Sequence, residues 1–147
     1  MTAARAFEDV RVGEQIPSLS KEVRREDVLA YADASTDRNP LHLDDDFARE
    51  AGFPGMIAHG MFTMAHLTTC VTDWVGDPDA LRYLRVLFRS AVAMGDQITA
   101  GGKVLEKDDE TKRVRLEVWV SIDGDGDGDG AKPDYAIRRS RAEVHLA

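Results

Sequence analysis

Hydrophobic and polar residues alternate most regularly between Val114 and Ile122, near the end of the chain. Valine, leucine or isoleucine occupies every second position of this segment, and mostly polar side chains stand between them. Successive side chains of a β-strand point to opposite faces, so this pattern predicts a strand with one buried face. Four less regular apolar runs predict further strands, at residues 18–24, 81–92, 97–105 and 135–146.

Apolar residues at helical spacing predict two short helices in the first half of the chain. Residues 27–34 form one amphipathic segment with acidic residues at its start. Residues 44–51 form the other, with Asp44 as a predicted N-cap and Gly52 as a predicted stop. The Asn39-Pro40 step predicts a loop between them, because a residue before proline avoids helical geometry.

The longest helical pattern runs from Gly60 to Trp74 and has no charged residue before Asp73. One face carries residues 61, 64, 65, 68 and 71, and further apolar side chains lie around it. A helix that is apolar nearly all round is typical of a buried helix. The sequence Gly76-Asp77-Pro78 predicts where it ends. We therefore expect an α+β domain in which an antiparallel meander wraps a central apolar helix.

Length and composition favour one soluble domain over residues 1–147, without repeats or linkers. The net charge of −8 disfavours a nucleic-acid partner, which usually requires a basic face. No apolar stretch reaches the length of about 20 residues that a membrane span needs, and no secretory segment is visible. We expect a cytoplasmic protein with no membrane association. Cys70, the single cysteine, excludes an intrachain disulfide and is expected to be buried.

Two motifs flank the predicted loop and the start of the long helix. The segment 37–42 reads DRNPLH and the segment 57–61 reads IAHGM. Together they resemble the MaoC-like, (R)-specific enoyl hydratase family, and the likeness covers residues 31 to about 74. The segment 74–78, WVGDP, is similar to the actinobacterial (3R)-hydroxyacyl-ACP dehydratase beta subunits. The resemblance implies a hot-dog fold, in which dimers join their sheets edge to edge.

The resemblance also implies roles for individual residues. It places the catalytic pair on Asp37 and His42, and the oxyanion-binding and substrate-binding positions on the Gly60 amide and on Asn39, which also braces the loop. Supporting roles fall on Thr68, as a hydroxyl beside the aspartate, and on His59, as a packing or bracing side chain. Two positions depart from the family pattern. Thr36 stands where the family usually has glycine, and the proline often found before the valine at position 92 is missing.

These residue types suit the hydration of an enoyl thioester. Water must reach the β-carbon, a proton must reach the α-carbon, and the carbonyl oxygen gains negative charge. Asp37 and His42 offer acid–base groups, and histidine has an ordinary pKa near 6.5. Gly60 offers an amide at a helix N-terminus. For dehydration we assign α-proton removal to His42 and hydroxyl protonation to Asp37, although the reverse emphasis is equally compatible with the sequence.

The expected enzyme is a hydro-lyase that interconverts trans-2-enoyl and (3R)-3-hydroxyacyl thioesters carried by CoA or acyl carrier protein. We expect no cofactor beyond that carrier. One alternative is a hot-dog thioesterase, which would need a carboxylate on the central helix, where residues 60–72 have none. Another is a non-catalytic acyl-binding subunit of a heterodimeric dehydratase, which the intact pair argues against.

Three further features bear on ligands and partners. The histidines lack metal-site spacing, so no metal is expected. The Asp-Gly run at 123–130 is a poor match to a calcium loop and predicts a solvated hairpin loop. Two groups of arginines are candidates for holding CoA phosphates or an acidic carrier protein: 82, 85 and 89, and 138, 139 and 141. An exposed sheet edge would need a partner, so we expect a homodimer or a heterodimer with a related hot-dog subunit.

Overall fold

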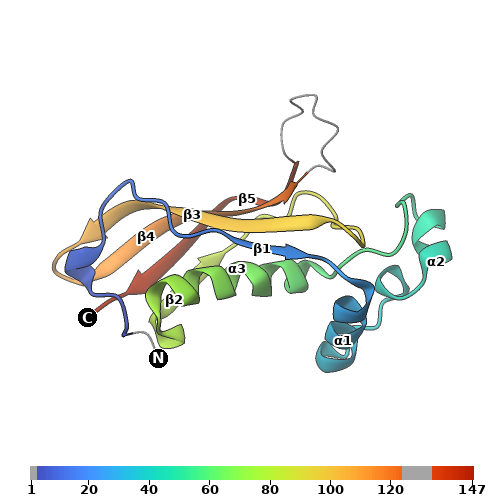
Figure 1. Cartoon of the computed structure of the whole chain (residues 1–147), viewed down its shortest axis with the longest axis horizontal. Coiled ribbons are helices and arrows are strands. Elements are labelled where there is room, and N and C mark those ends of the chain that lie inside the picture. The colour runs from blue at the N-terminus through green and yellow to red at the C-terminus, as the bar shows by residue number, and fades with distance from the viewer. Residues whose placement is uncertain (1–2, 124–133) are drawn as a thin grey trace.

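A curved antiparallel sheet lies over one long helix in the computed structural model, which describes residues 3–123 and 134–147 (Figure 1). The helices are α1 (Arg25–Ser35), α2 (Asp45–Glu50) and α3 (Gly60–Val75), with single 3-10 turns at Phe7–Asp9, Pro40–His42 and Pro78–Ala80. The strands are β1 (Leu19–Glu22), β2 (Leu81–Arg85), β3 (Gln97–Asp108), β4 (Arg113–Asp123) and β5 (Asp134–His145). Most of the predicted Asp-Gly loop, residues 124–130, lies outside the described residues.

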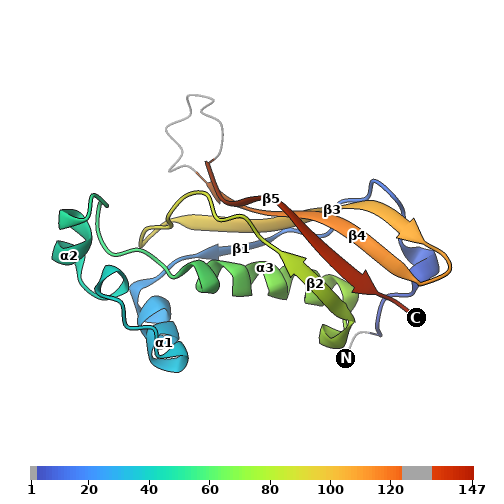
Figure 2. The same cartoon turned by 180° about the vertical axis from the view of Figure 1, so that it is seen from behind.

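The strand order across the sheet is β1-β3-β4-β5-β2, and every pairing is antiparallel. The predicted meander is confirmed for β3, β4 and β5, which are consecutive neighbours. It is wrong for β2, which pairs with β5 at the sheet edge rather than with β3 (Figure 2). This sheet around a central helix is the hot-dog fold, as the motifs implied.

The alternating segment forms β4, in the middle of the sheet, and confirms the strand prediction. Val114, Leu116, Val118 and Val120 are completely buried against the helix side of the sheet. On the opposite face, the indole of Trp119 covers its cross-strand neighbour on β3. That neighbour is a glycine for a steric reason, because a Cβ atom at position 101 would stand 2.8 Å from the indole Nε1.

Helix α3 has the predicted bounds to within one residue, and Gly76 ends it with a φ angle of +81°. Its burial differs from the expectation. The side facing the sheet is buried, including Phe62, Leu67 and Val71, whereas Met61 is 55% exposed. On the predicted apolar face, residues 61 and 65 are exposed, 64 and 68 are partly buried, and 71 is fully buried. The prediction of a helix buried all round was wrong because this sheet covers only one side of it.

The predicted strand at 81–92 was also too long. Strand β2 ends at Arg85, and single bridges from Phe88 to Ile137 and from Ala93 to Ile57 replace a continuous ladder. Arg139, within β5, has a φ angle of +53°, and the register with β4 shifts at this point. The amide of Leu87 donates to the Ser140 hydroxyl at 2.9 Å instead of joining the ladder. The chain therefore leaves the sheet early and runs toward the start of α3.

The two short helices lie beyond one end of the sheet, next to the start of α3 (Figure 1). Asp44 caps α2 as predicted, because its carboxylate accepts from the amides of Asp46 and Phe47. Cys70 is buried as predicted, and burial raises the pKa of its thiol to about 11. Among the described residues, no helix is long and apolar enough to cross a membrane.

Candidate active site

The loop after α1 carries the first predicted catalytic residue, Asp37. Helix α1 ends at Thr36, whose φ angle of +63° lies in the left-handed region. A β-branched residue rarely adopts that conformation, which glycine adopts freely. Position 36, where this chain has threonine and the family usually has glycine, therefore has a backbone conformation that favours glycine. The Asp37 side chain is exposed, and its Oδ1 accepts from the Asn39 amide at 3.3 Å.

Asn39 shapes the turn that presents His42. The Asn39 side chain accepts from the Leu41 amide at 3.0 Å and caps the 3-10 turn. The half-buried ring of His42 places Nδ1 2.8 Å from the carbonyl oxygen of Ile57. A carbonyl oxygen only accepts, so Nδ1 carries a hydrogen. His42 therefore leaves Nε2 as the nitrogen that can exchange a proton with a substrate.

His59 joins the two predicted catalytic residues. Its ring is 2% exposed and stacks on the His42 ring, with centroids 3.8 Å apart and planes 25° apart. Its Nε2–H donates to the backbone carbonyl of Asp37 at 2.9 Å. The remaining nitrogen, Nδ1, is buried and has no hydrogen-bond partner among the described residues. The predicted bracing role of the side chain thus has a defined geometry: one edge holds the loop and one face supports His42.

The three side chains form a compact group, in which one ligand-type atom from each lies within 4.8 Å of the others. A carboxylate and two imidazoles at this separation could also hold a metal ion. The two imidazoles are stacked, however, and one nitrogen of each ring donates to a backbone carbonyl. Stacked rings direct their in-plane lone pairs side by side rather than toward one point. The arrangement suits proton transfer better than chelation.

Gly60 begins α3 directly beside this group, at the edge of a cavity of about 210 Å³. His42, Ala58, Thr63 and Val92 contribute to the wall. His59 occupies the N-cap position without capping the helix through its side chain. The first amides of a helix lack acceptors within it, so the Gly60 amide is available to a ligand. A Cβ atom at Gly60 would stand 3.1 Å from the Phe88 ring, so a side chain here would crowd the cavity.

Comparisons with known proteins show the family of the chain. The sequence model of the MaoC like domain matches residues 9–124. The chain belongs to the MaoC-like dehydratase family. It is 34% identical to the 3-hydroxybutyryl-CoA dehydratase of Methylorubrum extorquens over 79% of this chain and 74% of that protein. It is 33% identical to the (R)-specific enoyl-CoA hydratase of Rhodospirillum rubrum, over 76% and 81% of the respective chains.

The fold comparison extends over nearly the whole MaoC-like chain. The solved structure of the (R)-hydratase from A. caviae, involved in PHA biosynthesis, superposes with a TM-score of 0.82 and 26% identity. The match covers 95% of this chain and 99% of that one. A hydro-lyase of this family requires acid–base groups and an oxyanion donor at one cavity, and here His42 and Gly60 line the same cavity.

Two observations differ from the sequence analysis or add to it. Thr68 lies two turns into α3, and its hydroxyl donates to the Met64 carbonyl at 2.9 Å rather than joining the group at Asp37. Asp45 was not predicted as a site residue, yet it ties the loops around the MaoC-like site together. Its carboxylate accepts from the Met56 amide at 2.9 Å and pairs with Arg25, and these contacts lower the pKa of Asp45. No motif signal distinguishes Asp45 from its acidic neighbours.

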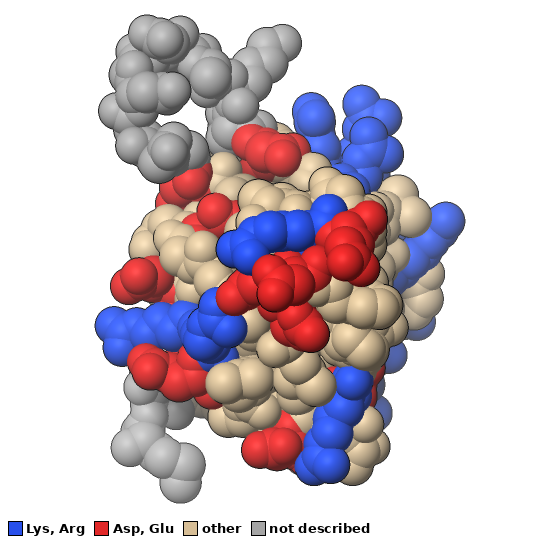
Figure 3. Space-filling model, turned by 90° about the vertical axis from the view of Figure 1, so that its right-hand side faces the viewer, with Lys and Arg blue, Asp and Glu red and all other residues tan. Residues whose placement is uncertain are grey.

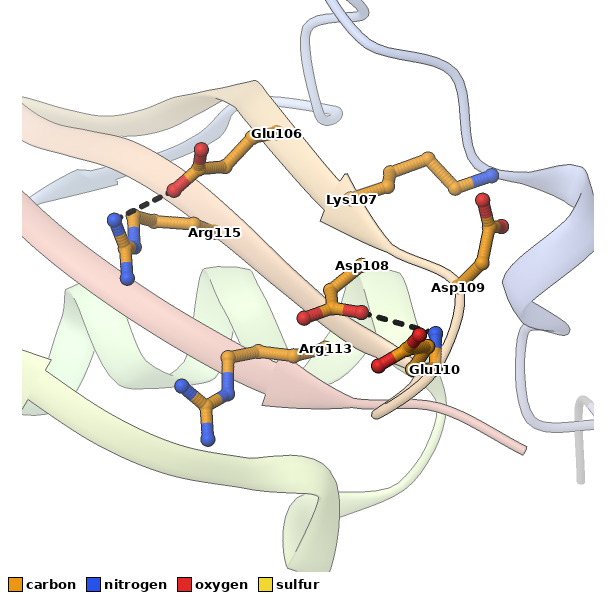
Figure 4. Close-up of a pocket in the computed structure, with 7 residues that line it drawn as sticks. All are labelled: Glu106, Lys107, Asp108, Asp109, Glu110, Arg113 and Arg115. Carbon is orange, nitrogen blue, oxygen red and sulfur yellow. Dashed lines mark hydrogen bonds and ion pairs between the residues drawn. The ribbon is translucent and has the colours of Figure 1, made fainter.

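A larger hollow of about 500 Å³ lies at the opposite end of the domain, beside the β3–β4 hairpin (Figure 4). Its side chains come from residues 106–110, 113 and 115. Arg115 pairs with Glu106 and Glu143, and Asp108 accepts from two turn amides. These charges neutralise one another along an open surface, and Figure 4 shows them spread out rather than converging. The cavity lined by His42 and Gly60 is the smaller of the two.

Proposed function

We propose that this protein interconverts trans-2-enoyl and (3R)-3-hydroxyacyl thioesters by adding or removing water. One observation carries the proposal: Asp37 and His42 bring a carboxylate and an imidazole together beside a cavity that ends at the Gly60 amide. The family and the two named relatives support a hydro-lyase that acts on an acyl thioester.

The proposed proton transfers follow from the tautomer of His42. In hydration, a water molecule lies between the Asp37 carboxylate and the His42 ring. Its oxygen bonds to the β-carbon as Asp37 takes one proton, and protonated His42 gives its Nε2 proton to the α-carbon. Asp37 then returns a proton to His42, so the enzyme ends as it began. Dehydration reverses each step, with His42 Nε2 removing the α-proton.

The thioester oxygen carries negative charge between these steps. We propose that it accepts from the Gly60 amide, where the dipole of the 16-residue helix α3 adds positive potential. His59 supports the same reaction indirectly, because its ring face lies against the ring that becomes positive when it takes the α-proton. The Ile57 carbonyl stabilises that imidazolium through Nδ1.

The other two functions considered are less well supported. A thioesterase would need a carboxylate on the central helix near the cavity, and the first carboxylate of α3 is Asp73, in its last turn. A purely acyl-binding subunit would not need the Asp37–His42 pair.

We further propose a dimer, because β2 forms a sheet edge with Tyr83 47% exposed, and the outward face of α3 leaves Met61 exposed. Light scattering coupled to gel filtration distinguishes this dimer from a monomer.

The first test measures the loss of enone absorbance when the purified protein meets crotonyl-CoA. We expect Asp37→Asn and His42→Gln to lower kcat by about 10²–10⁴-fold, the usual contribution of general acid–base groups. Asp33→Asn and His145→Gln are matched controls outside the cavity and should keep full activity. Circular dichroism checks that all four variants fold. Full activity in the first two variants would refute the proposed site.

A further inference from the structure

Most arginines of this acidic chain fall into two groups. Eight of them pair with a carboxylate. Among the residues that the structure describes, five exposed arginines near β2 and β5 have no carboxylate partner: Arg82, Arg85, Arg89, Arg138 and Arg139. Figure 3 shows basic side chains projecting from the right-hand side of the molecule, the side of β2 and β5. A group of uncompensated positive charges on an acidic protein indicates an anionic ligand.

Two of these arginines line a common hollow. Arg89 and Arg138, with Phe88, Ser90, Asp134 and Tyr135, surround a polar cavity of about 340 Å³. Backbone hydrogen bonds hold the two segments side by side: the Arg89 amide donates to Ala136 at 2.8 Å, and the Arg138 amide donates to Leu87 at 3.3 Å. The positions of both arginines are therefore fixed by their backbones, even though their side chains are exposed.

This polar hollow adjoins the catalytic cavity. Phe88, Arg89 and Ser90 line both of them. The segment that left the sheet after β2 thus forms a shared wall, with the 51% exposed Phe88 ring as its apolar part. An elongated molecule bound at His42 would therefore pass the Phe88 ring to reach the arginines.

The lining of the hollow suits a phosphate group. The Arg138 guanidinium lies 4.8 Å from the centre of the Tyr135 ring, which supports it while leaving its N–H groups free for a ligand. Asp134 is the acidic residue of the lining, and its Oδ1 already accepts from the Ser90 hydroxyl and the Tyr135 amide. Arginine binds phosphate through two parallel hydrogen bonds, which lysine does not offer.

We propose that Arg89 and Arg138 bind the phosphate groups of coenzyme A when its acyl chain occupies the catalytic cavity. This rests on the proposed function for the position of the acyl chain. A small carrier fits better than a carrier protein, because the two arginines line a hollow that adjoins the catalytic cavity. The phosphates bind in this hollow and the thioester reacts in the neighbouring cavity.

Calorimetric titration of the full chain with free coenzyme A tests the binding step without requiring turnover. We expect Arg89→Gln and Arg138→Gln each to weaken binding about tenfold, the usual effect of one charge-assisted hydrogen-bonding group. Arg11→Gln, an exposed arginine on the N-terminal segment, is the matched control and should bind as the wild type does. Wild-type affinity in both site variants would overturn the proposal.

Kinetics with two substrates then separates phosphate binding from catalysis. With crotonyl-CoA, we expect the Arg89→Gln/Arg138→Gln double variant to have a raised KM and an unchanged kcat. With crotonyl-pantetheine, which has no phosphate, kcat/KM should equal that of the wild type. Equal losses with both substrates would overturn the proposal, because the arginines would then act on the shape of the cavity. If the wild type binds coenzyme A through these arginines but hydrates neither substrate, the proposed function fails and the binding site stands.

Discussion

The central sheet and the loop of residues 36–59 are stabilised in different ways. Strand β4 buries a row of valine and leucine side chains completely, and its neighbours do the same. The loop begins with exposed residues and is fixed by individual hydrogen bonds from side chains to backbone, including those of Asn39, His42 and His59. Many apolar contacts together stabilise the sheet, whereas no other contact replaces an individual hydrogen bond of the loop.

This difference separates stability from activity. A cavity in the sheet should lower the free energy of unfolding while the folded molecules still react. A lost hydrogen bond in the loop should change the reaction rate more than the stability. The following predictions test this separation, beginning with the largest expected effect.

Leu116→Ala should lower the free energy of unfolding by about 2–5 kcal/mol, because Leu116 is completely buried in β4. The kcat of the remaining folded protein should change little. Urea denaturation and crotonyl-CoA turnover measure the two quantities. Leu29→Ala on α1, where the leucine is 38% exposed, is the matched control and should cost much less. A large fall in kcat of folded Leu116→Ala would show that the sheet and the site are not separable.

Two substitutions at His59 test separately its hydrogen bond to the Asp37 carbonyl and its stacking on His42. His59→Gln keeps a donor for the Asp37 carbonyl and loses the ring, whereas His59→Phe keeps a ring against His42 and loses the donor. Because the donor fixes the position of Asp37, we expect Phe to lower kcat roughly tenfold more than Gln, the effect of about one unmatched hydrogen bond. KM should be similar in both. The opposite order would identify stacking on His42 as the dominant contact.

Thr36→Gly should raise the free energy of unfolding by about 0.5–1 kcal/mol. Glycine adopts the left-handed conformation without the strain that threonine has there, and this gain is larger than the entropic cost of ordering a glycine. Thermal denaturation measures the change. Lys112→Gly is a control with a similar φ angle of +59° but no β-branched side chain, and it should gain less. A loss of stability in Thr36→Gly would mean that the threonine makes a compensating contact.

The smallest expected effect concerns His66, which donates to the Leu19 carbonyl at 2.8 Å and links α3 to β1. Burial lowers the pKa of His66 below its ordinary value of 6.5. The unfolded chain therefore binds a proton that the folded chain resists, and stability falls as the pH drops through 6.5 toward the lowered pKa. His66→Gln should flatten this decline in urea denaturation between pH 7 and 5. Identical pH profiles would exclude His66 as the cause.

The sequence predicted the elements whose cause is local. Period-two alternation found β4, and the Asp44 and Gly76 signals marked where helices begin and end. The motifs predicted that Asp37, His42 and Gly60 lie close together, which hydrophobic periodicity alone does not predict. The strand at 81–92 was overestimated because its partner strand β5 has an irregular backbone at Arg139, which lies far along the chain.

Two other features depend on contacts between distant segments. The outward face of α3 was expected to be buried because its composition shows apolar character and not what covers it. The clamp of Asp45 on Met56 and Arg25 has no sequence signature, because the three residues meet only after the helices pack. Such contacts become visible only in three dimensions.

The close contact of Trp119 with glycine on β3 gives the protein an internal optical probe. The chain has two tryptophans, and the other, Trp74, lies in the last turn of α3 with the Arg5 guanidinium 5.3 Å from its ring. One indole therefore reports on pairing in the sheet and the other on docking of the helix end. Replacing either with phenylalanine leaves a single emitter, so the fluorescence of the two layers can be followed separately as the chain folds.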